Sequence, residues 1–224
     1  MPASKPARLF IALIALSGLA VLGNALMHAG SDNRVRFVSF LLVACIAARL
    51  KVKLPGVTGT MSVNLPFILV AVAEMNTAEA MVVSCMSTLV QCVPTAGKKF
   101  NWVQTLFNFC NMALAVGATR LLYDSALLES IIKSRPLLLA LVTVGYFAVN
   151  SVPVAIIIWL TEGKNPVRAW VTMFQLSYPY FLIGASVAGL VIAVSSRVAW
   201  QLPVLVLPLM LGVFYSYRRY FAAL

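Results

Sequence analysis

The sequence predicts an all-α fold, a polytopic membrane helix bundle of roughly six to eight transmembrane helices in a single integral membrane domain over residues 1–224. Of its 224 residues, 62% are hydrophobic and 10% are charged, whereas soluble domains average about 45–50% apolar and about 25% charged residues. The mean hydropathy is +0.95. The apolar residues gather in long runs, several of them near the roughly 20 residues that a helix needs to cross a bilayer. These observations exclude a soluble globular domain and a disordered chain.

Eight apolar runs are expected to form the helices. The first run follows Lys5 and Arg8 and is longer than the apolar core of a signal peptide, so we expect a retained helix. The second and third runs are short for a full crossing and are expected to be tilted or to cross only in part. In chain order the runs are 9–28, 35–50, 64–75, 78–94, 102–122, 136–160, 170–195 and 198–217.

The segment 51–63, with the sequence KVKLPGVTGTMSV, interrupts this pattern because Pro55, Gly56 and Gly59 exclude a regular helix. One interpretation is an ordinary cytoplasmic loop. The other is a re-entrant loop that dips into the bilayer and offers the positive N-terminus of the helix at 64–75 to an anionic ligand.

The later runs carry boundary and kink signals of their own. Thr77 and Glu79 are expected to cap the helix at 78–94. Pro153 falls inside the sixth run and Pro179 inside the seventh, which predicts a weakened or kinked helix at each position.

The positions of the cations predict the orientation. With eight spans and a cytoplasmic N-terminus, most of the 17 Lys and Arg residues fall in inner segments. The positive-inside rule then places both termini in the cytoplasm. We expect a multi-pass protein of the cell inner membrane. The net charge of +11 is explained by this topology and by contact with anionic lipid headgroups. We therefore expect the lipid bilayer as a partner and no nucleic acid.

The sequence contains no pattern typical of an enzyme, a metal centre or a cofactor site. It has a single histidine, His28, no phosphate loop and no carboxylate in the middle of a run. We interpret Glu74, at a helix end, as a solvated turn residue, and expect Arg120 to snorkel outward or to pair with Asp124. The cysteines lack metal-ligand spacing and are interpreted as small buried hydrophobic residues. They are Cys45, Cys85, Cys92 and Cys110.

Five segments together resemble the multi-span N-terminal membrane region found ahead of HD-GYP and GGDEF signalling domains in bacteria. They are RLKVKLPGVTGTMSVNLPFILVAVAEMNTAEA, TLFNFCNMALAVGA, VGYFAVNSVPVAIIIWLTEG, WVTMFQLSYPYFLIG and FYSYRRY. The likeness covers about residues 7–221. It implies a sensor that feeds a cytoplasmic cyclic-di-GMP enzyme. The sequence ends just after Arg219 without an effector, so we expect the output to pass to another protein, unless the chain is a fragment.

The helical hairpin and its preceding loop are also similar to the substrate-binding subunits of energy-coupling-factor vitamin transporters. That likeness implies docking on transporter subunits through alanines four apart in the first helix, whereas Ala12, Ala15 and Gly18 lie three apart here. The alternatives to a sensor are therefore a substrate-binding or transport component for a small, vitamin-like solute and a ligand-free membrane scaffold.

Polar residues follow one face of the fifth run and recur in the sixth. Gln104, Asn108 and Asn111 are spaced by four and three residues, and Tyr146 and Asn150 by four, so each set shares a helix face. Polar side chains at membrane depth face protein or water rather than lipid. The two stripes therefore indicate either interhelical hydrogen bonds or the wall of a ligand pocket.

The predicted ligand-binding set adds two aromatic walls from the seventh run. It comprises Asn108, Asn111, Tyr146, Asn150, Tyr178 and Tyr180. With this site the sequence predicts a membrane-embedded sensory module. The module binds a small, partly apolar ligand or senses membrane state, and passes a conformational change to a cytoplasmic partner.

Overall fold

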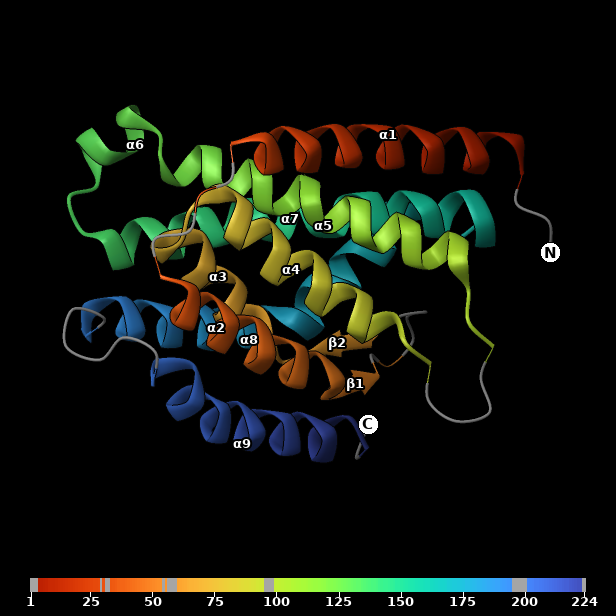
Figure 1. Cartoon of the computed structure of the whole chain (residues 1–224). Coiled ribbons are helices and arrows are strands. Elements are labelled where there is room, and N and C mark those ends of the chain that lie inside the picture. The colour runs from red at the N-terminus through yellow and green to blue at the C-terminus, as the bar shows by residue number, and fades with distance from the viewer. Residues whose placement is uncertain are drawn as a thin grey trace.

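The computed structural model describes residues 4–28, 30, 33–53, 55, 60–94, 99–194 and 201–222. Within these residues the chain forms nine helices and one two-stranded sheet (Figure 1). In chain order the elements are α1 (Lys5–Met27), α2 (Arg34–Arg49), β1 (Lys51–Lys53), β2 (Thr60–Ser62), α3 (Leu65–Glu74), α4 (Thr77–Cys92), α5 (Trp102–Tyr123), α6 (Ala126–Ile131), α7 (Arg135–Glu162), α8 (Pro166–Val194) and α9 (Leu202–Ala222).

The long helices run back and forth along a shared direction, so the bundle has two ends (Figure 1). One end, here called the sheet end, holds the start of α1, the β1–β2 sheet and the end of α9. The opposite end, here called the α6 end, holds α6 and the turn between α3 and α4.

Each of the eight predicted runs forms a helix, within a few residues of its expected bounds. The sequence did not predict the six-residue helix α6 or the antiparallel pairing of β1 with β2, in which Val52 lies opposite Met61. The described residues of the segment 51–63 are non-helical, as expected, while Gly56 and Gly59 lie outside the described residues. Re-entry of this segment into the bilayer stays a prediction.

Three helices in the described part of the chain are long and apolar enough to cross a membrane. They are α1, α7 and α8, and α3 is a shorter apolar helix. The all-α class and the apolar helices thus agree with the expected fold, and the count of six to eight spans stays a prediction.

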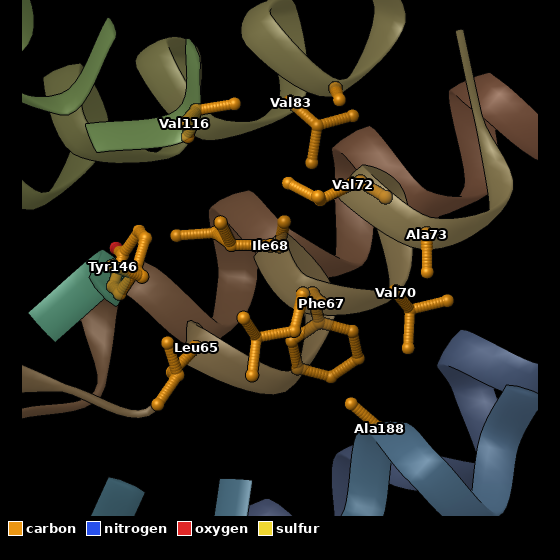
Figure 2. Packing of buried hydrophobic residues seen from close by; sticks show 14 of the residues in the cluster. Leu65, Phe67, Ile68, Val70, Val72, Ala73, Val83, Val116, Tyr146 and Ala188 are labelled. Atoms are coloured by element: carbon orange, nitrogen blue, oxygen red, sulfur yellow. The ribbon is translucent and has the colours of Figure 1, made fainter. Parts of the chain in front are cut away.

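Helix α3 is the centre of the hydrophobic core. All of its residues from Leu65 to Ala73 are buried. Figure 2 shows Val83 of α4 and Val116 of α5 on one side of this helix and Ala188 of α8 on the other. Because lipid tails are as apolar as these side chains, close van der Waals packing, rather than release of water, holds α3 among its neighbours. A helix enclosed in this way needs protein groups to satisfy its two ends.

Two polar contacts at the α6 end correct expectations from the sequence. The cap of α4 is Asn76, whose Oδ1 accepts from the backbone N–H of Glu79 at 2.9 Å, rather than Thr77. Glu74 is not a solvated turn residue, because its side chain is only 17% exposed and pairs with Arg36 of α2 at 2.7 Å. The carboxylate of Glu74 therefore ties α3 to α2.

Arg120 of α5 binds the same end of α3. Its Nε lies 2.6 Å from the Asp124 carboxylate, which confirms the expected ion pair. Its guanidinium also donates to the backbone carbonyls of Val72 and Met75. Arg120 therefore caps the C-terminus of α3, where the carbonyls have no partner within the helix.

The four cysteines are free thiols. Cys85 and Cys110 are buried and fit the interpretation as small hydrophobic core residues, whereas Cys45 and Cys92 are half-buried. Of these, Cys92 lies at the end of α4, close to the sheet end.

Candidate functional site

A cavity of about 410 Å³ lies where the sheet, α4, α5 and α7 meet. Six side-chain amides line it, and we call it the amide cavity. They are Gln91, Asn101, Gln104, Asn108, Asn111 and Asn150. Lys51 of β1 and Lys99, which precedes α5, also line this cavity.

A second cavity of about 170 Å³, here called the inner cavity, adjoins the first. Tyr146 of α7 and Tyr180 of α8 are in its wall. The two cavities share several lining residues: Thr60, Gln91, Met112, Asn150 and Val154. The pair therefore forms one polar region that extends from the sheet end into the bundle.

Asn111 and Asn150 connect α5 to α7 at the boundary of the two cavities. The Nδ2 of Asn111 donates to the backbone carbonyl of Asn150 at 2.8 Å and lies 3.2 Å from its side-chain Oδ1. A carbonyl only accepts, so this contact fixes the orientation of the Asn111 amide. Pro153 lacks the N–H that would bond to the Val149 carbonyl one turn back in α7, and the next carbonyl along the helix, that of Asn150, accepts from α5.

The sequence allowed two interpretations of the polar residues on α5 and α7, interhelical hydrogen bonds or the wall of a pocket. In the structure both apply to the same residues. Asn111 forms an interhelical hydrogen bond, and Asn108 donates to Cys92 Sγ at 3.5 Å. Both side chains also line the amide cavity. The Oδ1 of Asn111 is buried and has no hydrogen-bond partner among the described residues, and such an acceptor costs about 1–3 kcal/mol.

Tyr180 lies at the N-terminus of α3. Its hydroxyl oxygen accepts from the backbone N–H of Leu65 at 3.0 Å, and the side chain is 2% exposed. Tyr146, also buried, donates to Met112 Sδ at 3.4 Å. One interpretation of the sequence leaves the N-terminus of α3 free for an anionic ligand. In the structure the Tyr180 hydroxyl accepts from the Leu65 N–H at this N-terminus.

Tyr178 lies apart from the other five predicted site residues. It is 47% exposed and lines an apolar groove of about 760 Å³ between α7 and α8. Two steps along a helix rotate the side-chain direction by about 200°, so residues two apart point to nearly opposite sides. Tyr178 and Tyr180 therefore face different surroundings.

A buried polar network beside the inner cavity was not predicted from the sequence. The Ser62 hydroxyl lies 2.7 Å from Asn64 Oδ1 and 3.0 Å from Gln91 Oε1, and Asn64 Nδ2 donates to Ser87 at 3.1 Å. The sequence does contain a signal for part of this network. Ser84, Ser87 and Gln91 are spaced by three and four residues, so they share one face of α4, as the polar residues of α5 share one face of that helix.

Tyr180→Phe is expected to lower the free energy of unfolding by about 1–3 kcal/mol, because the Leu65 N–H would be left buried without an acceptor. Thermal unfolding of the purified protein in detergent measures the change. The matched control is Tyr178→Phe, which removes the hydroxyl from an exposed ring and should leave the midpoint unchanged. Equal shifts for the two variants would contradict the capping role.

No curated protein and no solved structure matched the sequence in the corresponding comparisons. The sequence does match the MASE9 family, over residues 8–221. This match spans almost all of the bundle, both cavities included, and it supports the sensory membrane region that the sequence resemblance implied. The chain therefore belongs to MASE9, a family of membrane-associated sensory domains.

Proposed function

We propose that this domain is a multi-pass sensor of the inner membrane that binds a small ligand in the amide cavity. The observation that carries the proposal is that six side-chain amides line one cavity of about 410 Å³. They come from α4, from α5 and the residue just before it, and from α7. Ligand sites in proteins are typically about 300–1,000 Å³ and hold a few convergent polar groups. In this proposal both termini are cytoplasmic, and the cavity opens toward the cytoplasm.

The proposed response begins at the contact between Asn111 and Asn150. A ligand that bonds either amide changes the contact that joins α5 to α7 beside Pro153. The movement can reach α8, because Trp170 Nε1 donates to Ser151 Oγ at 2.8 Å one residue beyond Asn150. A ligand shifts such an equilibrium only by its difference in affinity for the two arrangements.

The proposed output passes through the sheet to α9. Lys51 of β1 lines the amide cavity, and β1 packs against α9, which ends at the same end of the bundle. Ligand site and C-terminal helix therefore share one end. A cytoplasmic signalling enzyme of the HD-GYP or GGDEF kind, on the same chain or on another, is the partner that we propose.

Asn108→Leu and Asn150→Leu are expected to abolish ligand retention. Each removes a polar wall group, and the loss of about 1–3 kcal/mol corresponds to roughly a 5- to 150-fold weaker affinity. The measurement is mass spectrometry of the small molecules that the protein releases on denaturation after purification in native lipid discs. The matched control is Asn24→Leu, the same change at an exposed position of α1.

Retention at the wild-type level in both cavity variants would contradict the assignment of the site. A wild-type protein that releases no compound, and gains no thermal stability from a metabolite extract, would contradict ligand sensing. Partner-dependent uptake of the released compound into proteoliposomes would instead favour a transport component, because a sensor binds without moving solute.

A further inference from the structure

We propose that the amide cavity selects a small anion, a molecule with a carboxylate, sulfonate or phosphate group held near Lys51 and Lys99. The proposal rests on the proposed ligand-binding function and names the class of ligand. Both lysines line the cavity, and its described wall contains no aspartate or glutamate. The remaining polar groups of the wall are neutral amides, hydroxyls and a thiol, which give hydrogen bonds without offsetting the positive charge.

The distribution of acidic residues strengthens the positive potential at this site. Among the described residues, four carboxylates belong to the α6 end of the bundle, opposite the cavity. They are Glu74, Glu79, Asp124 and Glu129. At the sheet end, Glu162 lies 2.7 Å from Lys164. Charges at the far end of the bundle are beyond the screening length of about 8 Å at physiological salt, so they do not offset the lysines.

Of the two helix ends beside the cavity, the N-terminus of α5 adds to the positive charge, and the negative C-terminus of α4 is covered by cations. The C-terminus of α4 is negative, and Arg49 and Lys51 cover it. Arg49 donates to the carbonyls of Val90 and Val93 at 3.5 and 3.3 Å, and Lys51 donates to the Val93 carbonyl at 2.9 Å. The N-terminus of α5 contributes roughly half a positive charge to the wall.

The body of the cavity suits the rest of such a molecule. Its amides come from three helices and supply both donors and acceptors. Its volume of about 410 Å³ accommodates a small metabolite. The anion has two possible sources, a water-soluble metabolite or the headgroup of an anionic lipid, and the two share the chemistry that the lysines recognise.

Cys92 provides a reporter inside the cavity wall. Methanethiosulfonate reagents convert a thiolate into a mixed disulfide and release methanesulfinate, and they are made in neutral, anionic sulfonate and cationic trimethylammonium forms. The rate at Cys92 of the wild-type protein is followed by peptide mass spectrometry in phosphatidylcholine nanodiscs. Each rate is divided by the rate with a free thiol in solution. The thiolate fraction of Cys92 is common to all three reagents, so the ratio of anionic to cationic rates reports the local potential.

We expect the anionic reagent to be favoured at least fivefold over the cationic one. Lys99→Gln and Lys51→Gln should each lower this ratio roughly threefold, because each removes one positive charge from the wall of a water-filled cavity. Glutamine keeps an N–H donor for the Val93 carbonyl, so Lys51→Gln tests charge rather than the hydrogen bond. The matched control is Lys133→Gln near the α6 end, which should leave the ratio unchanged.

Two results overturn the proposal, and they are distinguishable. Reaction of the neutral reagent without preference for the anionic one refutes anion selection and leaves the ligand cavity intact. Failure of the neutral reagent to reach Cys92 refutes the open cavity, and with it the proposed function.

The source of the anion follows from protection of Cys92 against the neutral reagent. Slower labelling only when phosphatidylglycerol is added to the nanodiscs assigns a lipid headgroup. Slower labelling with millimolar inorganic phosphate or citrate in pure phosphatidylcholine assigns a soluble anion. Protection by none of these overturns the proposal, because a positive potential without occupancy is not a binding site.

Discussion

Replacing Arg120 with methionine is expected to lower the free energy of unfolding by about 3 kcal/mol, since a charged donor to a buried acceptor contributes about 1.5–3 kcal/mol. The guanidinium donates to the carbonyls of Val72 and Met75 at the end of α3, and its side chain is only 21% exposed. Methionine keeps the apolar length of the side chain and removes every donor. The C-terminal carbonyls of the central helix then have neither a donor nor a cation near the negative end of the helix dipole. Thermal or denaturant unfolding in detergent measures the loss.

The control for this prediction is Asp124→Asn. Asp124 is 51% exposed, and an exposed ion pair contributes at most about 1 kcal/mol. The Asp124 variant should therefore lose much less stability than Arg120→Met. Equal losses would mean that Arg120 acts through its ion pair, and that the carbonyls of α3 have other partners in the membrane.

The course of the chain was predictable because each long helix is encoded locally. An apolar run and its bounding polar residues lie within the same twenty or so positions, and all eight runs form helices. The cavity wall was predictable for the same reason. Asn108 and Asn111 share one face of α5, and Tyr146 and Asn150 share one face of α7, so the four side chains gather once α5 packs against α7.

Contacts between distant segments were not predictable, because their partners carry no local signal. Arg36 and Glu74 are 38 residues apart, and nothing near either residue marks the other. Arg120 binds backbone carbonyls, which every residue has, so its role at α3 leaves no trace in the sequence. The cap of α4 was predicted one residue late, since Asn76 and Thr77 are both good capping residues.

The lysines of the amide cavity were missed for a related reason. Lys51 belongs to a three-residue strand and Lys99 precedes α5, so neither lies on a helix face where periodicity could relate it to the asparagines. Short strands of this kind give almost no alternating pattern. In the sequence, both lysines only indicate the cytoplasmic side of the membrane. A lysine on that side can also bind an anion.

Gly18→Ala is expected to destabilise the protein by about 2–4 kcal/mol, because the new methyl group would push the backbones of α1 and α5 apart. A Cβ at Gly18 of α1 would overlap the carbonyl oxygen of Cys110 in α5 and would lie 2.7 Å from its Cα. A side chain can rotate away from such a clash, whereas two packed helices must separate along their whole contact. Overpacking of a close contact typically costs about 1–3 kcal/mol, and more where relief is blocked. Unfolding in detergent, with the midpoint compared to the wild type, measures the loss.

Gly23→Ala provides the opposite expectation within the same helix. Apart from its own helix backbone and chain neighbours, no atom of the described residues lies within 4 Å of a Cβ at Gly23, so alanine gains up to about 1 kcal/mol from its higher helix propensity. The same substitution five residues apart should thus change sign, and only the contact with Cys110 distinguishes the two sites. If both variants behave alike, α1 does not pack on α5 through Gly18. The small residues Ala12, Ala15 and Gly18 would then be available to a partner helix, as docking in the transporter subunits requires, and the proposal of a sensor would lose ground to that of a transport component.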